Sequence, residues 1–168
     1  MPFTLHTAFV PPITHALTQL SAILEKAAAF AETRKIEPSV LLNSRLAPDM
    51  FALARQVQIA SDISKLGAAR LTGTEAPTYP DTETTFPELQ ERIAKTIAYL
   101  RGFDAASFNG AEEREVLLKG PHGEIRFTGE EFLSYFVLPN VYFHITAAYS
   151  ILRHNGLEIG KMDYLGPR

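Results

Sequence analysis

Cysteine is absent from the sequence, and its absence excludes several kinds of site at once. A chain without thiols has no disulfide framework, no thiolate metal centre and no cysteine nucleophile. Any metal ion must therefore be held by nitrogen and oxygen ligands. The sequence also lacks a glycine-rich phosphate loop and any recognisable arrangement of Ser with His and Asp, so neither phosphate-loop nor triad chemistry is predicted.

Basic runs and long apolar runs are missing as well. The formal net charge is -3 and the sequence pI is about 5.9. Binding to a nucleic-acid backbone requires a concentration of Lys and Arg that this chain does not have. No segment is apolar over the length needed to span a bilayer, and the N-terminal stretch lacks the basic region of a signal peptide. We therefore expect a cytoplasmic protein that binds neither nucleic acid nor membrane.

The composition that is present is that of an ordinary globular domain. The chain has 168 residues, of which 46% are hydrophobic and 21% are charged. This length and this balance suit one domain with one core. No internal repeat or low-complexity segment divides the chain, so we expect residues 1–168 to form a single domain.

Apolar residues recur at steps of three and four in four stretches, which is the spacing that lines one face of an α-helix. The prolines at positions 11 and 12 suit the first turn of the first helix, where a missing N–H costs little. Thr85 and Thr128 each precede a Glu by three residues, which is the pattern of a capping box at a helix start. The predicted helices cover residues 11–32, 49–71, 86–103 and 129–155.

Two insertions separate the later helices. Residues 73–84, GTEAPTYPDTET, lack apolar periodicity, so we expect an extended crossover between the second and third helices. Alternating apolar residues around 120–123 predict a small β-hairpin between the third and fourth helices, packed against them because an isolated hairpin is only marginally stable. The expected fold class is all-α, a four-helix bundle whose sites are built by side chains that point inward from facing helices.

The fourth predicted helix carries two polar residues on a face that is otherwise apolar. At about 100° per residue, Asn140 and His144 lie one turn apart among Leu, Val, Ala and Ile side chains. Pro139 directly precedes them and leaves the carbonyl of Tyr135 without its usual donor. The second helix has a matching feature, because Gln56 lies on an apolar stripe near its start. We expect Gln56, Asn140 and His144 to meet in the core.

Three interpretations of this cluster remain open. A neutral His with nearby amide oxygens can ligate a divalent metal such as Zn, Ni or Mn, although Asn and Gln are weak ligands for these ions. The same groups can form a metal-free polar pocket. They can also satisfy one another and the carbonyl released by Pro139, because buried polar groups are normally paired.

Several motifs resemble those of a known superfamily over nearly the whole chain. They are PDMFALARQVQIASD and AARLTG in the second helix, LPNVYFHITAAYSILRHNG in the fourth, and the GKMDYLG that follows. With these motifs the chain resembles a domain-of-unknown-function branch of the DinB/YfiT-like superfamily that is found in bacteria and fungi. The resemblance implies a four-helix bundle that is often dimeric, so we expect a homodimer.

The resemblance also implies a site. Many DinB/YfiT-like proteins are regarded as metal-dependent enzymes with three His ligands, one on the second helix and a His-x-x-x-His pair on the fourth, and some are thiol-dependent transferases. Matched by position, the pair falls on Asn140 and His144, and the remaining ligand falls on or near Gln56. One of the three positions carries His. His144 is therefore the candidate catalytic residue, with Gln56 and Asn140 as ligand-binding or metal-binding partners.

Two functions of different kinds follow from these observations. The first is a metal-dependent small-molecule transferase or hydrolase, with His144 as ligand or general base in a cleft between the second and fourth helices. The second is a non-catalytic protein that binds a small ligand or dimerises, in which the polar cluster only fixes the helix register. The metal content of the purified protein distinguishes the two.

Overall fold

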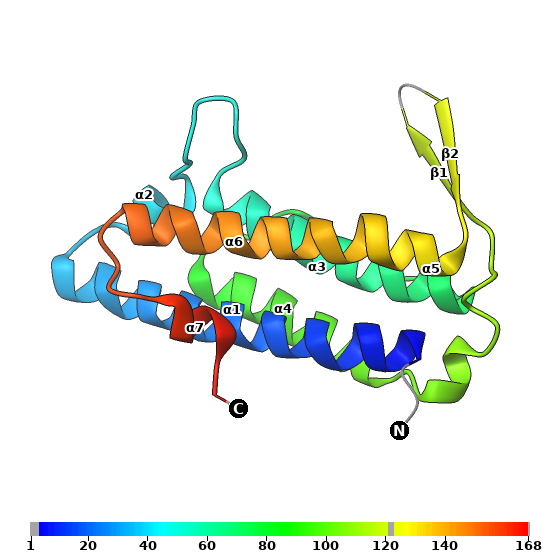
Figure 1. The fold of residues 1–168 in the computed structure, drawn as a ribbon. Coiled ribbons are helices and arrows are strands. Elements are labelled where there is room, and N and C mark those ends of the chain that lie inside the picture. Colours follow the sequence, from blue (N-terminus) through cyan, green and yellow to red (C-terminus); the bar gives the residue numbers. More distant parts are fainter. Residues whose placement is uncertain (1–3, 121–122, 168) are drawn as a thin grey trace.

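Four long helices form the body of the protein (Figure 1). The computed structural model describes residues 4–120 and 123–167. Around the bundle, α1 contacts α4 and α6, and α3 contacts the same two helices. The prediction of an all-α bundle is therefore confirmed. The bundle helices are α1 (Leu5–Arg34), α3 (Leu53–Thr72), α4 (Phe86–Arg101) and α6 (Leu138–His154).

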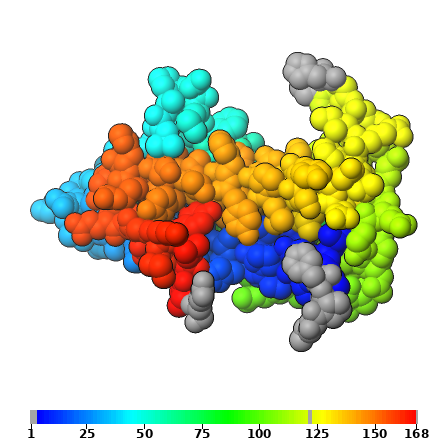
Figure 2. Space-filling view, in the orientation of Figure 1, coloured from blue at the N-terminus to red at the C-terminus, as the bar shows by residue number. Residues whose placement is uncertain are grey.

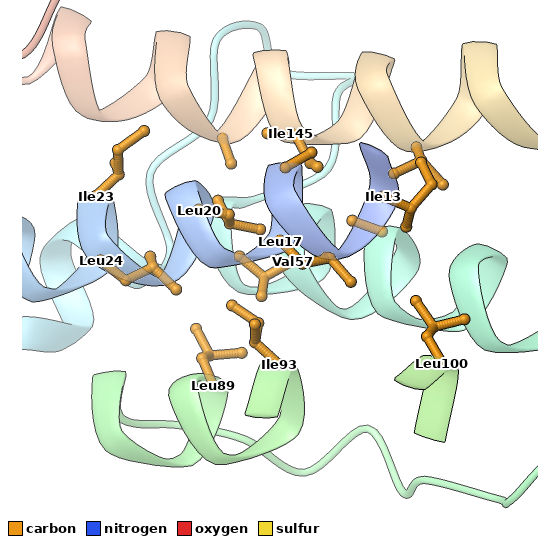
Figure 3. Close-up of a cluster of buried hydrophobic side chains, with 14 of the residues drawn as sticks. Ile13, Leu17, Leu20, Ile23, Leu24, Val57, Leu89, Ile93, Leu100 and Ile145 are labelled. Carbon is orange, nitrogen blue, oxygen red and sulfur yellow. The ribbon is translucent and has the colours of Figure 1, made fainter. Parts of the chain in front are cut away.

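The core lies between these helices because each contributes an apolar stripe. The stripe of α1 is the longest, and Ile13, Leu17, Leu20 and Leu24 within it are fully buried. Figure 3 shows these side chains converging with apolar side chains of α3, α4 and α6. Burial of one such side chain stabilises the fold by about 1.5–3 kcal/mol. The shared core therefore holds α3 and α6 in fixed positions relative to each other.

α1 begins earlier than the sequence predicts. Thr4 starts it with a capping box, and the helix continues through Pro11 and Pro12 instead of beginning at them. The prolines remove two backbone donors from the helix. The hydroxyl of Thr14 donates to the carbonyl of Val10 at 2.8 Å in the same turn. Buried apolar residues lie on both sides of the prolines, and this packing outweighs their local cost.

A short helix and a loop precede α3, which therefore starts later than predicted. α2 (Pro38–Leu42) follows α1 in a stretch for which no helix was predicted. Residues 43–52, which we call the α2–α3 loop, then project from the bundle beside α6 (Figure 1). The backbone N–H of Leu53 donates to the carbonyl of Ser44 at 2.9 Å and closes this loop at its base.

The crossover between α3 and α4 is confirmed. Residues 73–84 contain no helix or strand and connect the end of α3 to the start of α4. α3 and α4 therefore run in the same direction, and α1 and α6 run in the opposite one (Figure 1). Gly73 ends α3 in the left-handed conformation, and the predicted capping box of Thr85 and Glu88 starts α4.

The hairpin is also confirmed, but it contacts the bundle only at its base. It follows a short 3-10 helix, η1 (Ala105–Phe108), and consists of β1 (Val116–Gly120) and β2 (Gly123–Phe127) in antiparallel register. Its turn residues 121–122 lie outside the described part. The ring of Phe127 lies 6.1 Å from that of Phe132 and 6.2 Å from that of Phe136. The rest of the hairpin projects away from the helices (Figure 1).

The fourth predicted helix is a continuous element of three parts. α5 (Gly129–Glu131) begins at the predicted cap Thr128, and a π-helical stretch, η2 (Phe132–Val137), leads into α6. The wider π turn ends two residues before Pro139, which has no backbone N–H to donate. Although α6 is apolar, no helix in the described part of the chain is long and apolar enough to cross a membrane.

The C-terminal segment folds back over α1. Its short helix α7 (Lys161–Leu165) is held by an ion pair between Lys26 and Asp163. Nε2 of His15 lies 2.6 Å from the carbonyl oxygen of Leu165. The ring of Tyr164 contacts that of Tyr149 on α6 edge to face. α7 thus bridges α1 and α6 on the outside of the bundle.

Candidate functional site

α3 and α6 face each other in the bundle, and each places one polar side chain at their contact. Gln56 lies in the first turn of α3, and His144 lies in the middle of α6. Both are buried, with 1% and 8% of their surface exposed. The apolar residues on the same helix faces pack into the core, and this packing buries both polar side chains. Each side chain therefore needs a hydrogen-bond partner within the protein.

A chain of hydrogen bonds fixes the orientation of both side chains. Nε2 of Gln56 donates to the carbonyl oxygen of Phe51 at 3.1 Å, so Oε1 of Gln56 is the atom directed at His144. This Oε1 accepts a hydrogen bond from Nδ1 of His144 at 2.7 Å. Because an amide oxygen can only accept, the imidazole proton is on Nδ1 and the lone pair is on Nε2.

The surroundings keep His144 neutral near pH 7. Burial lowers the pKa of the imidazole below its ordinary value of 6.5, and the charge of Arg55 lowers it further. A neutral imidazole with its lone pair on Nε2 is a hydrogen-bond acceptor and a base. The hydrogen bond to Gln56 and the lowered pKa therefore both indicate that Nε2 of His144 is an acceptor and a base.

Asn140 does not take part in this contact. Its Nδ2 donates to the backbone carbonyl of Phe136 at 2.7 Å. The missing N–H of Pro139 and the π-helical stretch before it disturb the regular backbone bonds of this turn, and the Asn140 amide supplies a donor there. The structure thus brings Gln56 and His144 together and places Asn140 on a hydrogen bond to its own helix.

The residues at this position do not suit a divalent metal ion. Zinc sites in proteins use three or four His, Cys, Asp or Glu ligands. No group of three such residues that could hold an ion occurs within residues 4–120 and 123–167. The side-chain oxygen of Gln56 faces the Nδ1 proton of His144, and the Asn140 amide nitrogen faces a carbonyl. One imidazole nitrogen remains as a ligand, so we assign no metal-dependent step to this site.

An apolar groove lies between the α2–α3 loop and the outer side of α6, and neither Gln56 nor His144 lines it. Its volume is about 370 Å³. The ring of Phe143 forms part of it and meets the His144 ring edge to face, with 5.2 Å between the ring centroids. Such a groove suits the nonpolar part of a small molecule. It is lined by Leu46, Met50, Tyr142, Phe143, Thr146, Ala147 and Ser150.

Two residues of the site were not identified from the sequence. Phe51 acts through its backbone carbonyl, and no side-chain pattern indicates such a role. The guanidinium of Arg55 lies 6.0 Å from the centre of the Phe51 ring and forms an ion pair with Asp81 of the crossover. The sequence feature that could have identified Arg55 is its position next to Gln56 at the start of α3.

A second polar centre, also not predicted, lies between α3, α4 and the crossover. The side chain of Arg92 is 2% exposed, and its guanidinium donates to Asp62 at 2.8 Å and to Asp81 and Glu83 at 2.9 Å each. Burial alone would lower the pKa of Arg92, but the three carboxylates outweigh burial and raise it. The sequence feature that could have predicted this centre is an Arg on the apolar stripe of α4, close to an acidic crossover. This centre anchors the crossover.

Comparisons with known proteins agree with this architecture. The family described as Domain of unknown function (DUF1993) matches residues 5–165. A crystal structure of a DinB family member protein from Shewanella denitrificans, determined at 1.83 Å resolution, matches with a TM-score of 0.91 and 50% sequence identity. The match covers 98% of this chain and 93% of that chain. A search of curated proteins found no match.

Proposed function

The chain belongs to the DUF1993 family of DinB-like bundles, and we propose that it binds a small molecule at His144 without a metal ion. The observation that carries the proposal is the hydrogen-bond chain from the Phe51 carbonyl through Gln56 to His144. This series of hydrogen bonds keeps the imidazole proton on Nδ1. Nε2 is then the acceptor for a hydroxyl or N–H group of the ligand.

The groove and Arg55 indicate the kind of molecule. Leu46, Met50 and Phe143 provide an apolar surface for the body of the ligand. For a ligand with an acidic hydroxyl, His144 would accept the proton at Nε2 as a general base. The positive charge of Arg55 would then favour the anion that remains. A small, largely apolar molecule with one acidic hydroxyl group fits this arrangement.

Nitrogen NMR and thermal shifts test the binding role of His144. Two-bond proton–nitrogen spectra should show the proton on Nδ1, and a panel of phenols and small alcohols should contain members that raise the Tm. His144→Ala should abolish this rise. His154→Ala, an exposed position on the same helix, should retain it. A proton on Nε2, or equal shifts in the wild type and in His144→Ala, would contradict the proposal.

Metal independence requires a separate measurement. The protein is incubated with excess Zn, Ni or Mn and desalted, and the metal that remains bound is measured. We expect less than one ion per chain, with the same value for His144→Ala. One ion per chain that His144→Ala removes would instead support a metal-dependent transferase or hydrolase.

A further inference from the structure

Arg55 belongs to a closed network of polar side chains, which we call the Arg55 network. Its guanidinium forms the ion pair with Asp81 and donates to Oε1 of Gln58 at 3.2 Å. Nε2 of Gln58 donates in turn to Glu83 at 2.9 Å. Arg92 closes the network, because it donates to the second carboxylate oxygen of Asp81 and of Glu83. These five side chains join α3, the crossover and α4.

Part of the Arg55 network is buried and part is accessible to solvent. Gln58 and Arg92 are buried, and the side chain of Glu83 is 12% exposed. The side chains of Arg55 and Asp81 are each 40% exposed. An ion pair exposed to this degree adds little to stability, so it can open while the buried part of the network remains intact. Arg55 is therefore the member of the network that can leave its place.

The guanidinium of Arg55 also contacts the loop that orients His144. It lies 6.0 Å from the centre of the Phe51 ring, a distance at which a cation is attracted to an aromatic face. The carbonyl of Phe51 accepts from Gln56, and Gln56 accepts from His144. Phe51 belongs to the α2–α3 loop, which projects from the surface beside α6 (Figure 2). Arg55 thus links its network to this loop.

The charge of Arg55 acts on His144 as well. It favours the neutral imidazole, in the same direction as burial does. A Coulomb interaction weakens with distance, so its strength depends on where the guanidinium lies. The ion pair with Asp81 and the hydrogen bond to Gln58 determine that position. The charge that acts on His144 therefore depends on residues outside the His144 site.

We propose that Asp81 is a positioning residue for the His144 site, because it holds Arg55 where the positive charge reaches the imidazole. This inference rests on the proposed function, in which Nε2 of His144 accepts a proton from an acidic hydroxyl and Arg55 favours the anion. While the ion pair is closed, the site favours an ionised ligand. When the ion pair opens, the guanidinium turns toward solvent and this preference is lost. The crossover in this way regulates which ligands bind at His144.

A double-mutant cycle on the protein without ligand tests the role of Asp81. The variants are Asp81→Ala, Arg55→Met and their combination, and NMR titration of the imidazole C–H signals measures the pKa of His144. If Asp81 acted only through its own charge, its removal would change this pKa equally with and without Arg55. We expect Asp81→Ala to shift the pKa further upward when Arg55 is present, because the guanidinium then moves away. Equal changes in the two backgrounds overturn the proposal.

The proposed binding at His144 is tested separately by the thermal shifts, so its failure and a failure of the cycle are distinct results. Asp81→Asn is a second variant for the cycle, because its amide oxygen can still accept from Arg92 and keep the crossover anchored. Circular dichroism verifies that each variant is folded. Glu91→Ala removes an exposed carboxylate that pairs with Lys95 on α4, and it should change the pKa of His144 equally in both backgrounds. A dependence on Arg55 as large for Glu91 as for Asp81 would also overturn the proposal.

Discussion

Nδ1 of His144 on α6 lies 2.7 Å from Oε1 of Gln56 on α3, and this hydrogen bond joins the two helices inside the bundle. An amide oxygen accepts the bond without bringing a charge into the core. A carboxylate at the same place would instead stabilise the protonated imidazolium. The amide at position 56 therefore leaves intact the neutral state of His144 that burial and Arg55 favour.

Gln56→Glu should raise the pKa of His144, from below its ordinary value of 6.5 to above it. The new carboxylate would lie within hydrogen-bond distance of Nδ1 and favour the charged ring. NMR titration of the imidazole C–H signals measures the pKa directly. The same substitution at Gln90 on α4 serves as the control and should leave the pKa unchanged. An unaltered pKa in Gln56→Glu would show that the two side chains are not in contact in solution.

The stability of the fold should fall as the pH falls below about 6.5. Burial and Arg55 depress the pKa of His144 in the folded state. Between the folded and unfolded pKa values, the unfolded chain binds a proton that the folded chain does not, so acid favours unfolding. Above this window the contribution is fully present. Urea denaturation from about pH 8 to about pH 5 measures it. His144→Gln should flatten this part of the pH profile, and an unchanged profile would be inconsistent with a depressed pKa.

Arg92→Met should destabilise the protein by about 3–5 kcal/mol. The substitution leaves Asp62, Asp81 and Glu83 without the guanidinium that they share. Lys95→Met on the same helix removes an exposed ion pair to Glu91 and should cost far less, because exposed ion pairs contribute little to stability. Urea denaturation compares the two variants. Similar small losses in both would show that the crossover does not depend on Arg92.

Gly129→Ala should destabilise the fold by about 3 kcal/mol or more. A Cβ at this position would lie 1.8 Å from the carbonyl oxygen of Ala111, so the backbone itself would have to move. Gly160→Ala is the matched control, because no atom lies within 4 Å of the added Cβ. Thermal unfolding should separate the two variants clearly, and a near-neutral Gly129→Ala would mean that this close approach relaxes readily.

The helices that could be predicted are those whose position depends on neighbouring residues in the sequence. Apolar stripes located the bundle helices, and the capping boxes at Thr85 and Thr128 marked two helix starts. The start of α1 was predicted wrongly, because burial on both sides of Pro11 and Pro12 outweighs their local preference. The sequence could not show that Asn140 and His144 have different hydrogen-bond partners, since both lie on one face of the helix. Their different partners depend on a π-helical stretch that no residue pattern indicates.

The oxygen that anchors Gln56 belongs to the backbone of Phe51, in the α2–α3 loop. If this loop shifted, the Gln56 amide would lose its acceptor and could turn over, presenting its N–H₂ group to the imidazole. The ring proton would then move from Nδ1 to Nε2, and His144 would change from an acceptor to a donor. The position of the loop would in this way determine which ring nitrogen of His144 carries the proton.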